Sequence, residues 1–245
     1  MRIADGVEAL ELPMRFAGAE STVYPAVLWD QGGEATLVDA GLPGHEALIE
    51  RLLGGLGLGP KALRRIILTH QDLDHIGSAP AMAVLAGAQV MAHGGDVPYI
   101  QGERRLLKLD PRRFEERLKD QPESVRESVR RVIADPPKVR VDRILRDGEE
   151  LPWHGGIVVI HTPGHTPGHV SLYHKASRLL ISGDALRVEN GALVGPSPNA
   201  TLDLAEATRS LQKLLGLAID RVLCYHGGLA GPGAAARLRE LSRPA

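Results

Sequence analysis

One stretch of the sequence decides the fold: Ile66-Ile67-Leu68-Thr69-His70-Gln71-Asp72-Leu73-Asp74-His75. In this stretch an apolar run is followed directly by a polar turn. The run Arg65–Leu68 is short and rich in Ile and Leu, which is typical of a buried strand. A helix is expected from about Gly77 to Ala86, so the polar turn lies in a strand-to-helix loop, where α/β folds place their sites. The alternative is a polar turn in which an Asp caps the next helix. Four metal-competent side chains lie within this turn: His70, Asp72, Asp74 and His75.

Three further strand ends carry the same kinds of side chain. The expected strand Ile157–His161 runs into Thr162-Pro163-Gly164-His165-Thr166-Pro167-Gly168-His169, where two Pro-Gly pairs predict tight turns. Ser182-Gly183-Asp184 and Cys224-Tyr225-His226-Gly227-Gly228 also follow expected strands. A lone His is usually a surface or core residue. His or Asp at four separate strand ends is better explained by one shared metal site.

Taken in order, these motifs resemble those of the metallo-β-lactamase superfamily. The chain carries Thr-His-x-x-x-Asp-His, then Thr-Pro-Gly-His-Thr-x-Gly-His, then Ser-Gly-Asp and a late His-Gly. The resemblance extends from Leu37-Val38-Asp39-Ala40-Gly41 to His226, almost the whole chain. It implies an α/β fold in the form of a four-layer αββα sandwich. Two halves, each made of strands followed by helices, are also expected from the sequence pattern.

The resemblance further implies that the site binds two divalent metal ions. His70 and His165 would bind the first ion, and Asp184 would bridge both ions. The remaining ligands of the second ion would be Asp74, His75 and His226. Zinc is the expected metal, with iron or manganese as alternatives.

Two other residues receive supporting roles from the same resemblance. Asp39 would support the site from the first sheet, and His169 would lie behind the ligands or face the substrate. Asp74 would orient the attacking hydroxide and is therefore the predicted catalytic residue.

One position departs from the family pattern His-x-His-x-Asp-His, because Asp72 stands where the second His is usual. A carboxylate also binds metals, so Asp72 is predicted to be a ligand of the first ion. With Asp72 the site would have three carboxylates and a hydroxide, and their negative charges would neutralise two divalent ions. The common ligand set has two carboxylates and a hydroxide, and it leaves one positive charge in excess. The harder oxygen ligand would also shift the metal preference from zinc toward iron or manganese.

Residues 1–245 are interpreted as one domain with a helical insertion at about 96–146. The insertion holds 14 Lys and Arg between Arg104 and Arg146 and 9 Asp and Glu between Glu103 and Asp142. This excess of positive charge would attract an anionic substrate. The alternative is that these charged residues form a solvated helix surface. A single helix over 112–133 has apolar residues spaced to bury one face. That face would pack on the core or on a second copy of the chain, giving a homodimer.

The other elements follow from hydrophobic spacing and turn residues. Strands are expected at Val7–Leu12, Val23–Trp29, Ala35–Asp39, Gln89–Ala92, Ile144-Leu145, Val170–Tyr173, Leu179–Ile181 and Arg221–Tyr225. Further helices are expected at Gly44–Leu53, at about Leu204–Leu215 and from Gly233 onward.

Composition excludes several classes of protein. The net charge is −1, with 29 Lys and Arg against 30 Asp and Glu, so no basic field favours nucleic acid. Aromatic residues make up 3% of the chain, which leaves few platforms for stacking bases. Cys224 is the one cysteine, so no internal disulfide forms, and it is interpreted as a small buried hydrophobe. Without a leader or an apolar span, the protein is expected in the cytoplasm and off the membrane.

The expected function is hydrolysis of an ester-like bond, a thioester, lactone or phosphoester, in a small anionic molecule. A hydroxide shared by two metal ions would attack the bond. Lactonases of this family place a Tyr three residues after the bridging Asp, but this chain has Arg187, which suggests an anionic substrate or is a plain surface arginine. Two alternatives stay open at this point: a mononuclear non-haem iron oxidoreductase of the sulfur dioxygenase type, and a non-catalytic binding module.

Overall fold

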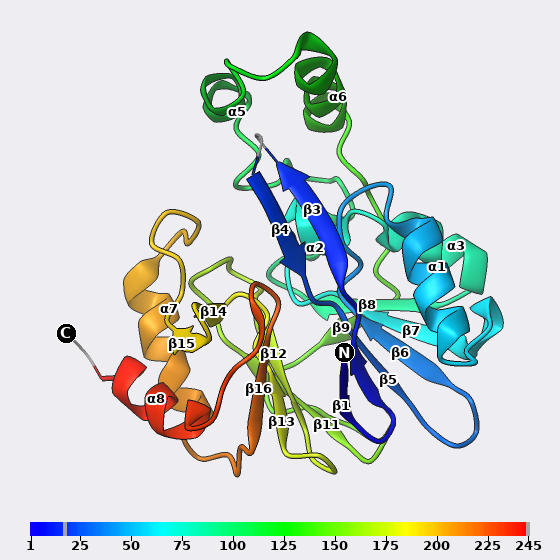
Figure 1. Ribbon diagram of the computed structural model, residues 1–245, viewed down its shortest axis with the longest axis vertical. Helices are drawn as coiled ribbons and strands as arrows, with labels where there is room; N and C mark the ends of the chain where they lie inside the picture. Colours follow the sequence, from blue (N-terminus) through cyan, green and yellow to red (C-terminus); the bar gives the residue numbers. More distant parts are fainter. Residues whose placement is uncertain (17–18, 244–245) are drawn as a thin grey trace.

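The computed structural model describes residues 1–16 and 19–243, which form two main β-sheets (Figure 1). Within these residues the first sheet has seven strands in the order β1-β2-β5-β6-β7-β8-β9. Their bounds are β1 (Arg2–Ala4), β2 (Val7–Ala9), β5 (Ala26–Trp29), β6 (Ala35–Val38), β7 (Leu63–Ile67), β8 (Gln89–His93) and β9 (Arg143–Leu145).

The second sheet has six strands over the same described part of the chain, in the order β10-β11-β12-β13-β16-β17. Their bounds are β10 (Glu150–Leu151), β11 (Ile157–His161), β12 (Val170–His174), β13 (Leu179–Ile181), β16 (Arg221–Cys224) and β17 (Gly228–Leu229).

The two sheets pack face to face because apolar side chains occupy both faces of their central strands. Side chains alternate between the faces of a strand with a period of two residues. In β11, Ile157 and Val159 therefore join the core between the sheets, while Val158 and Ile160 face outward. In β7, Ile67 joins the same inner core. Strands that are apolar on both faces need a covering layer on each side.

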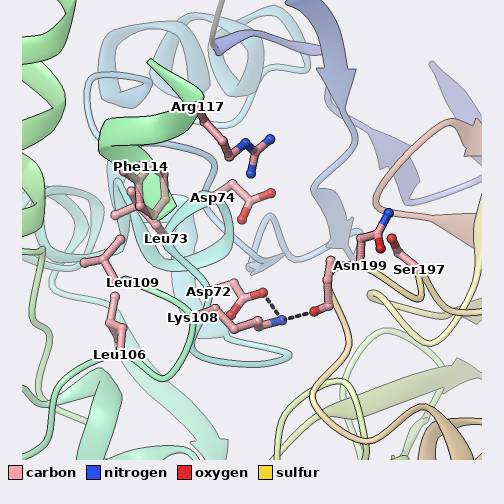
Figure 2. A pocket seen from close by; sticks show the side chains of 11 residues that line it. Asp72, Leu73, Asp74, Leu106, Lys108, Leu109, Phe114, Arg117, Ser197 and Asn199 are labelled. Carbon is pink, nitrogen blue, oxygen red and sulfur yellow. Dashed lines mark hydrogen bonds and ion pairs between the residues drawn. The ribbon is translucent and has the colours of Figure 1, made fainter. Parts of the chain in front are cut away.

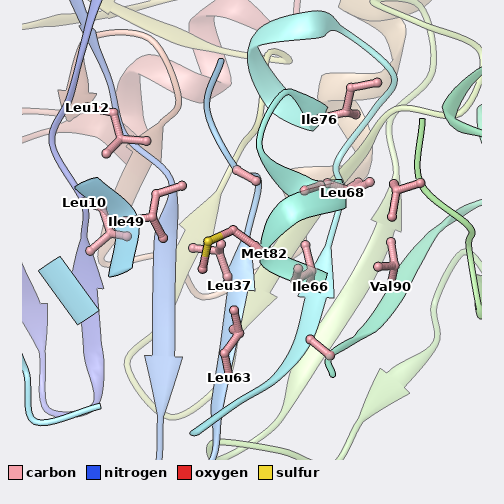
Figure 3. Packing of buried hydrophobic residues seen from close by; sticks show 14 of the residues in the cluster. Leu10, Leu12, Leu37, Ile49, Leu63, Ile66, Leu68, Ile76, Met82 and Val90 are labelled. Carbon is pink, nitrogen blue, oxygen red and sulfur yellow. The ribbon is translucent and has the colours of Figure 1, made fainter. Parts of the chain in front are cut away.

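Helices supply these outer layers. Helices α1 (Glu46–Gly55) and α3 (Ala79–Ala86) cover the first sheet, where Ile49 and Met82 pack among Leu37, Ile66 and other side chains (Figure 3). Helices α7 (Leu204–Ser210) and α8 (Ala234–Leu241) cover the second sheet. The chain is thus a four-layer αββα sandwich, and the predicted fold class is confirmed.

Parallel strands bring the polar loops to one edge of the sandwich. Strands β6, β7 and β8 run parallel, with Val38 opposite Ile67, and β13 runs parallel to β16, with Ile181 opposite Leu223. The loops after these strands therefore start at the same edge. This is the edge that carries the histidine and aspartate motifs.

The remaining elements are hairpins, helices and turns in the connections between these strands (Figure 1). Two hairpins are formed by β3 (Leu12–Phe16) with β4 (Ala19–Val23) and by β14 (Arg187–Glu189) with β15 (Ala192–Val194). The other helices are α2 (Leu73–Ile76), α4 (Val97–Ile100), α5 (Pro111–Arg117) and α6 (Glu123–Ala134), and the 3₁₀ turns are η1 (Pro60–Ala62) and η2 (Leu211–Leu214).

The prediction of one helix over 112–133 was wrong, because the structure has two helices, α5 and α6, with a break between them. Pro122 stands at the N-cap of α6, where its missing N–H and rigid ring prevent a helix from continuing through it. Glu115 of α5 instead pairs with Arg126 and Arg130 of α6 across the break.

Much of the apolar face of this helical pair packs against the chain itself. Ile133 is buried, and Phe114 and Val129 pack against the core of the first sheet. The core of the first sheet is therefore a partner of this face.

Smaller differences concern strand ends. The expected strand Val7–Leu12 is split between β2 and β3, and Val23–Trp29 is interrupted before β5, near Pro25, which cannot donate to a strand ladder. The helix expected at Leu204–Leu215 ends at Ser210 and continues as η2. Across residues 1–16 and 19–243, no helix combines the length and apolar character needed to cross a membrane.

Candidate metal centre

Seven of the predicted side chains come together at the polar edge in two groups. The donor atoms of each group lie within 4.8 Å of one another. The first group consists of His70, Asp72, His165 and Asp184. The second group consists of Asp74, His75 and His226. Both groups combine imidazole nitrogens with carboxylate oxygens, the ligands that suit zinc, iron and manganese.

Each ligand is placed by the loop that follows a strand. His70 and Asp72 lie in the loop after β7, and α2 presents Asp74 and His75 one position apart on its first turn. His165 lies in the tight turn between β11 and β12, where Gly164 adopts a φ of +124°. An added Cβ at Gly164 would stand 2.1 Å from the backbone nitrogen of Ala207, so only glycine fits this approach.

Asp184 lies between the two groups. Its Oδ2 atom is 3.2 Å from His165 Nε2 in the first group and 3.4 Å from His226 Nε2 in the second. Its Oδ1 atom is 3.3 Å from His75 Nε2. Burial alone would raise the pKa of Asp184, but His226, His75 and His165 together hold it well below its usual value. The carboxylate is therefore ionised and faces both groups.

A second layer of hydrogen bonds fixes the orientation of the imidazoles. Asp39 Oδ2 accepts from His75 Nδ1 at 2.9 Å and from the Thr69 hydroxyl at 2.8 Å. Since the Thr69 proton is used in that bond, Thr69 Oγ1 accepts from His70 Nδ1 at 3.0 Å. Both histidines therefore carry their proton on Nδ1 and leave Nε2 available for a metal.

Three atoms at the centre of the site support this assignment. His70 Nε2, His75 Nε2 and Asp184 Oδ1 are buried and have no hydrogen-bond partner among the described residues. Buried polar atoms without partners are costly, and cations held in the two groups would satisfy all three. Although burial works in the opposite direction, Asp39, Asp184 and Asp74 raise the pKa of His75 well above its usual value. The arrangement thus attracts positive charge and fits divalent metal ions.

His169 lies beside the two groups and belongs to neither. Its Nε2 accepts a hydrogen bond of 2.9 Å from the backbone nitrogen of Asp184, while its Nδ1 is 2.9 Å from the Thr162 hydroxyl. His169 thus links the turn after β11 to the loop that carries Asp184.

Three residues of the site were not predicted from the sequence. Tyr225 stacks on His75 with a ring-centroid distance of 3.7 Å, and its hydroxyl donates to the backbone oxygen of Asp74. Asp96 is buried and accepts hydrogen bonds from Gln71 N, Thr166 Oγ1 and Gly168 N. Lys108, from the loop between α4 and α5, reaches Asp72 and His165.

Two cavities open onto the ligands. The larger has a volume of about 540 Å³ and combines Asp72, Asp74 and Lys108 with the apolar side chains Leu73, Leu106, Leu109 and Phe114 (Figure 2). Arg117 of α5 also lines it. The smaller has a volume of about 320 Å³ and lies beside Asp184 and His226. Ser197 and Ala200 line both cavities, so the two spaces adjoin each other beside the two candidate ligand groups.

Arg187 lines the smaller cavity, but its charge is partly used within the chain. Its guanidinium pairs with Glu189, and its Nε donates to the backbone oxygen of Gly195 at 3.1 Å. The cations that line the larger cavity, Lys108 and Arg117, come instead from the insertion.

Cys224 is buried under the site and is expected to be unreactive. Burial raises the pKa of its thiol to about 12, so the thiolate is essentially absent at pH 8. We expect no alkylation of the native protein by iodoacetamide at pH 8 over an hour, and full alkylation after unfolding in guanidinium. Mass spectrometry would measure both. Rapid labelling of the folded chain would contradict the burial of this thiol.

Comparison with known proteins agrees with this geometry. The sequence model described as the metallo-beta-lactamase superfamily matches residues 22–226. The chain is 30% identical to the probable metallo-hydrolase YflN of Bacillus subtilis, over 84% of this chain and 80% of that protein. It is 27% identical to the hydroxyacylglutathione hydrolase GloC of Haemophilus influenzae, over 66% of this chain and 65% of that protein. A metallo-beta-lactamase family protein from Thermus thermophilus has a solved structure that is similar with a TM-score of 0.73 and 28% identity, covering 98% of this chain and 79% of the other.

Proposed function

Because this chain belongs to the metallo-β-lactamase superfamily and is a metallohydrolase, we propose that it holds two divalent metal ions and cleaves an ester-like bond with them. The observation that carries the proposal is the position of Asp184, whose two oxygens face histidines of both ligand groups. Zinc is the first candidate, since the histidine-rich donor sets suit it, and the extra carboxylate of Asp72 keeps iron and manganese as candidates.

Different residues of the chain would orient the attacking water and hold the metal-binding histidines. When bound, the two ions would supply an activated water and polarise the carbonyl or phosphoryl oxygen under attack. Asp74 lines the larger cavity, and its Oδ2 is 3.3 Å from His226 Nε2, so it is suited to orient the attacking water and accept its proton. Asp39 and Thr69 would keep His70 and His75 in the tautomer that binds metal.

The larger cavity favours a substrate with an apolar part and an anionic part. Leu106, Leu109 and Phe114 offer one apolar wall, and Arg117 offers a cation on the same cavity. Arg guanidinium groups suit carboxylates and phosphates. We propose a small thioester with a carboxylate or phosphate group as the substrate class, in keeping with the thioester-cleaving hydroxyacylglutathione hydrolases among the relatives.

The test begins with elemental analysis of the purified, untagged protein by mass spectrometry. About two zinc, manganese or mixed divalent ions per chain would support the proposal. One iron per chain, with oxygen consumption on persulfides, would overturn it in favour of an iron oxidoreductase. Less than half a metal ion per chain after zinc is supplied would also overturn it.

The substrate class is tested with matched pairs of thioesters, lactones and phosphoesters, each made with a free carboxylate and as its neutral methyl ester. We expect kcat/KM for the carboxylate-bearing thioester to exceed that of its methyl ester by at least about tenfold, since a cation–anion contact to the substrate contributes about 1.5–3 kcal/mol. Equal rates on both members of each pair would contradict the anionic part of the proposal.

A further inference from the structure

Lys108 places its ammonium group directly on the first ligand group. Its Nζ atom pairs closely with Asp72 Oδ2 and lies 2.8 Å from the backbone oxygen of Ala200 (Figure 2). The same atom lies 2.7 Å from His165 Nε2. A lysine ammonium has three N–H donors, and three oxygen or nitrogen atoms of the chain lie within hydrogen-bond distance of it here. Only 15% of the Lys108 side chain is exposed. This is a fully satisfied contact, and it does not resemble a solvated surface charge.

The two side-chain acceptors differ in what they can do when a metal is bound. The Asp72 carboxylate has two oxygens and several lone pairs, so it can accept from Lys108 and still bind a cation. An imidazole nitrogen has a single lone pair to offer, and His165 Nε2 already lies 3.1 Å from Asp72 Oδ2 and 3.2 Å from Asp184 Oδ2, while its Nδ1 lies 3.3 Å from the Thr201 hydroxyl. His165 must therefore exchange Lys108 for the metal, whereas Asp72 can keep both.

We propose that Lys108 and Asp72 act as one unit that replaces a single neutral histidine at the first metal position, and that this unit sets the metal affinity of that position. The inference rests on the proposed dinuclear function. Asp72 adds one negative charge relative to the usual histidine, and the ammonium of Lys108 cancels it at hydrogen-bond distance. Lys108 is a positioning residue, because it acts through Asp72 and His165.

The charge balance of the site explains how the pairing of Lys108 with Asp72 would affect the bound metal ions. With three carboxylates and a hydroxide, two divalent ions would be neutralised, and the pull of the metals on a substrate carbonyl would weaken. The ammonium of Lys108 restores the excess of positive charge that the common ligand set provides. Because Lys108 belongs to the loop between α4 and α5, binding at the first position is also coupled to the segment that lines the substrate cavity.

The test is a double-mutant cycle on metal affinity, with Lys108→Met and Asp72→His made singly and together. Zinc dissociation constants are measured by competition with a chromophoric chelator, and zinc per chain by elemental analysis. We expect Lys108→Met to tighten the weaker zinc site at least about tenfold while Asp72 is present, since a nearby like charge is removed. In the Asp72→His variant the carboxylate that pairs with the Lys108 ammonium is absent. Lys108→Met should therefore change the zinc affinity of that variant less than threefold.

Two controls keep the result interpretable. Lys119→Met removes an exposed lysine of the insertion that pairs with Glu116, and it should leave both zinc sites unchanged. Lys108→Gln also removes the charge, but its side chain can still donate a hydrogen bond to Ala200. This variant replaces Lys108→Met in the cycle if Lys108→Met does not fold. Circular dichroism and thermal unfolding of every variant would separate loss of fold from loss of affinity.

The outcomes separate this inference from the proposed function. A wild-type chain that binds fewer than two metal ions would overturn the dinuclear function and the inference with it. Two tightly bound ions with the same Lys108→Met effect in both backgrounds, or with weaker zinc binding in Lys108→Met, would overturn the inference alone. A coupling of tenfold or more between positions 72 and 108 is the expected result.

Discussion

Replacing Asp184 by Ala is expected to lower kcat/KM for the best ester substrate by on the order of 10³-fold and to remove at least one metal ion per chain. The physical reason is that one carboxylate serves both ligand groups, with Oδ1 facing His75 and Oδ2 facing His165 and His226. Alanine leaves three histidines facing one another without the anion between them. Elemental analysis and steady-state kinetics on the same preparation would measure both effects.

A matched control for this experiment is Asp220→Ala. Asp220 is half-exposed and pairs with Arg178 on the surface, and exposed pairs of this kind contribute about 0–1 kcal/mol. We expect its metal content and kcat/KM to match those of the wild type. Full activity and unchanged metal content in Asp184→Ala would overturn the dinuclear site.

The parts of the site that follow strands could be predicted from the sequence. Parallel strands end at the same edge of a sheet, so short polar motifs after β7, β13 and β16 had to meet once the fold was set. The layers were predictable for a similar reason, since strands apolar on both faces need a second sheet on one side and helices on the other.

The contact of Lys108 with Asp72 could not be predicted from the sequence. It lies in an irregular loop of the insertion, far along the chain from Asp72, and no repeat or spacing links the two positions. A lysine in a basic segment looks like a solvated charge until the tertiary structure shows its neighbours. Its partner Asp72 did stand out in the sequence, because it occupies the position where the family pattern has a histidine and adds one negative charge.

The wrong helix prediction and the missed residue Asp96 have specific causes. Apolar spacing continues from α5 into α6, and this periodicity hides the break, although Pro122 should have outweighed it. Asp96 carries the same signal as the metal ligands, a carboxylate just after a strand, here β8 with Gly94-Gly95 between. It lacks a neighbouring motif of histidines, so nothing in the sequence distinguishes it from an ordinary loop residue.

Substitution of Asp96 by Ala is expected to destabilise the protein by about 3–4 kcal/mol, because it leaves buried donors without partners. Asp96 Oδ2 accepts from Gln71 N at 2.9 Å and from Thr166 Oγ1 at 2.7 Å, and its Oδ1 accepts from Gly168 N at 2.7 Å. Gln71 stands between two ligands of the first group, and Thr166 directly follows His165. Asp96 therefore connects the two loops that carry His70, Asp72 and His165 of the first candidate group.

The same substitution should weaken metal binding about 10–100-fold, which is typical when a residue that orients metal ligands is lost. Asp96→Asn keeps one acceptor oxygen for Gly168 N but turns an amide donor toward Gln71 N and Thr166, so we expect an intermediate loss of both stability and affinity. Asp5→Ala is the control, because the Asp5 side chain is fully exposed. Thermal unfolding with zinc removed would report stability, and chelator competition would report affinity. If Asp96→Ala lost stability and kept wild-type zinc affinity, its hydrogen bonds would support the fold alone, and the two ligand loops would hold their geometry without it.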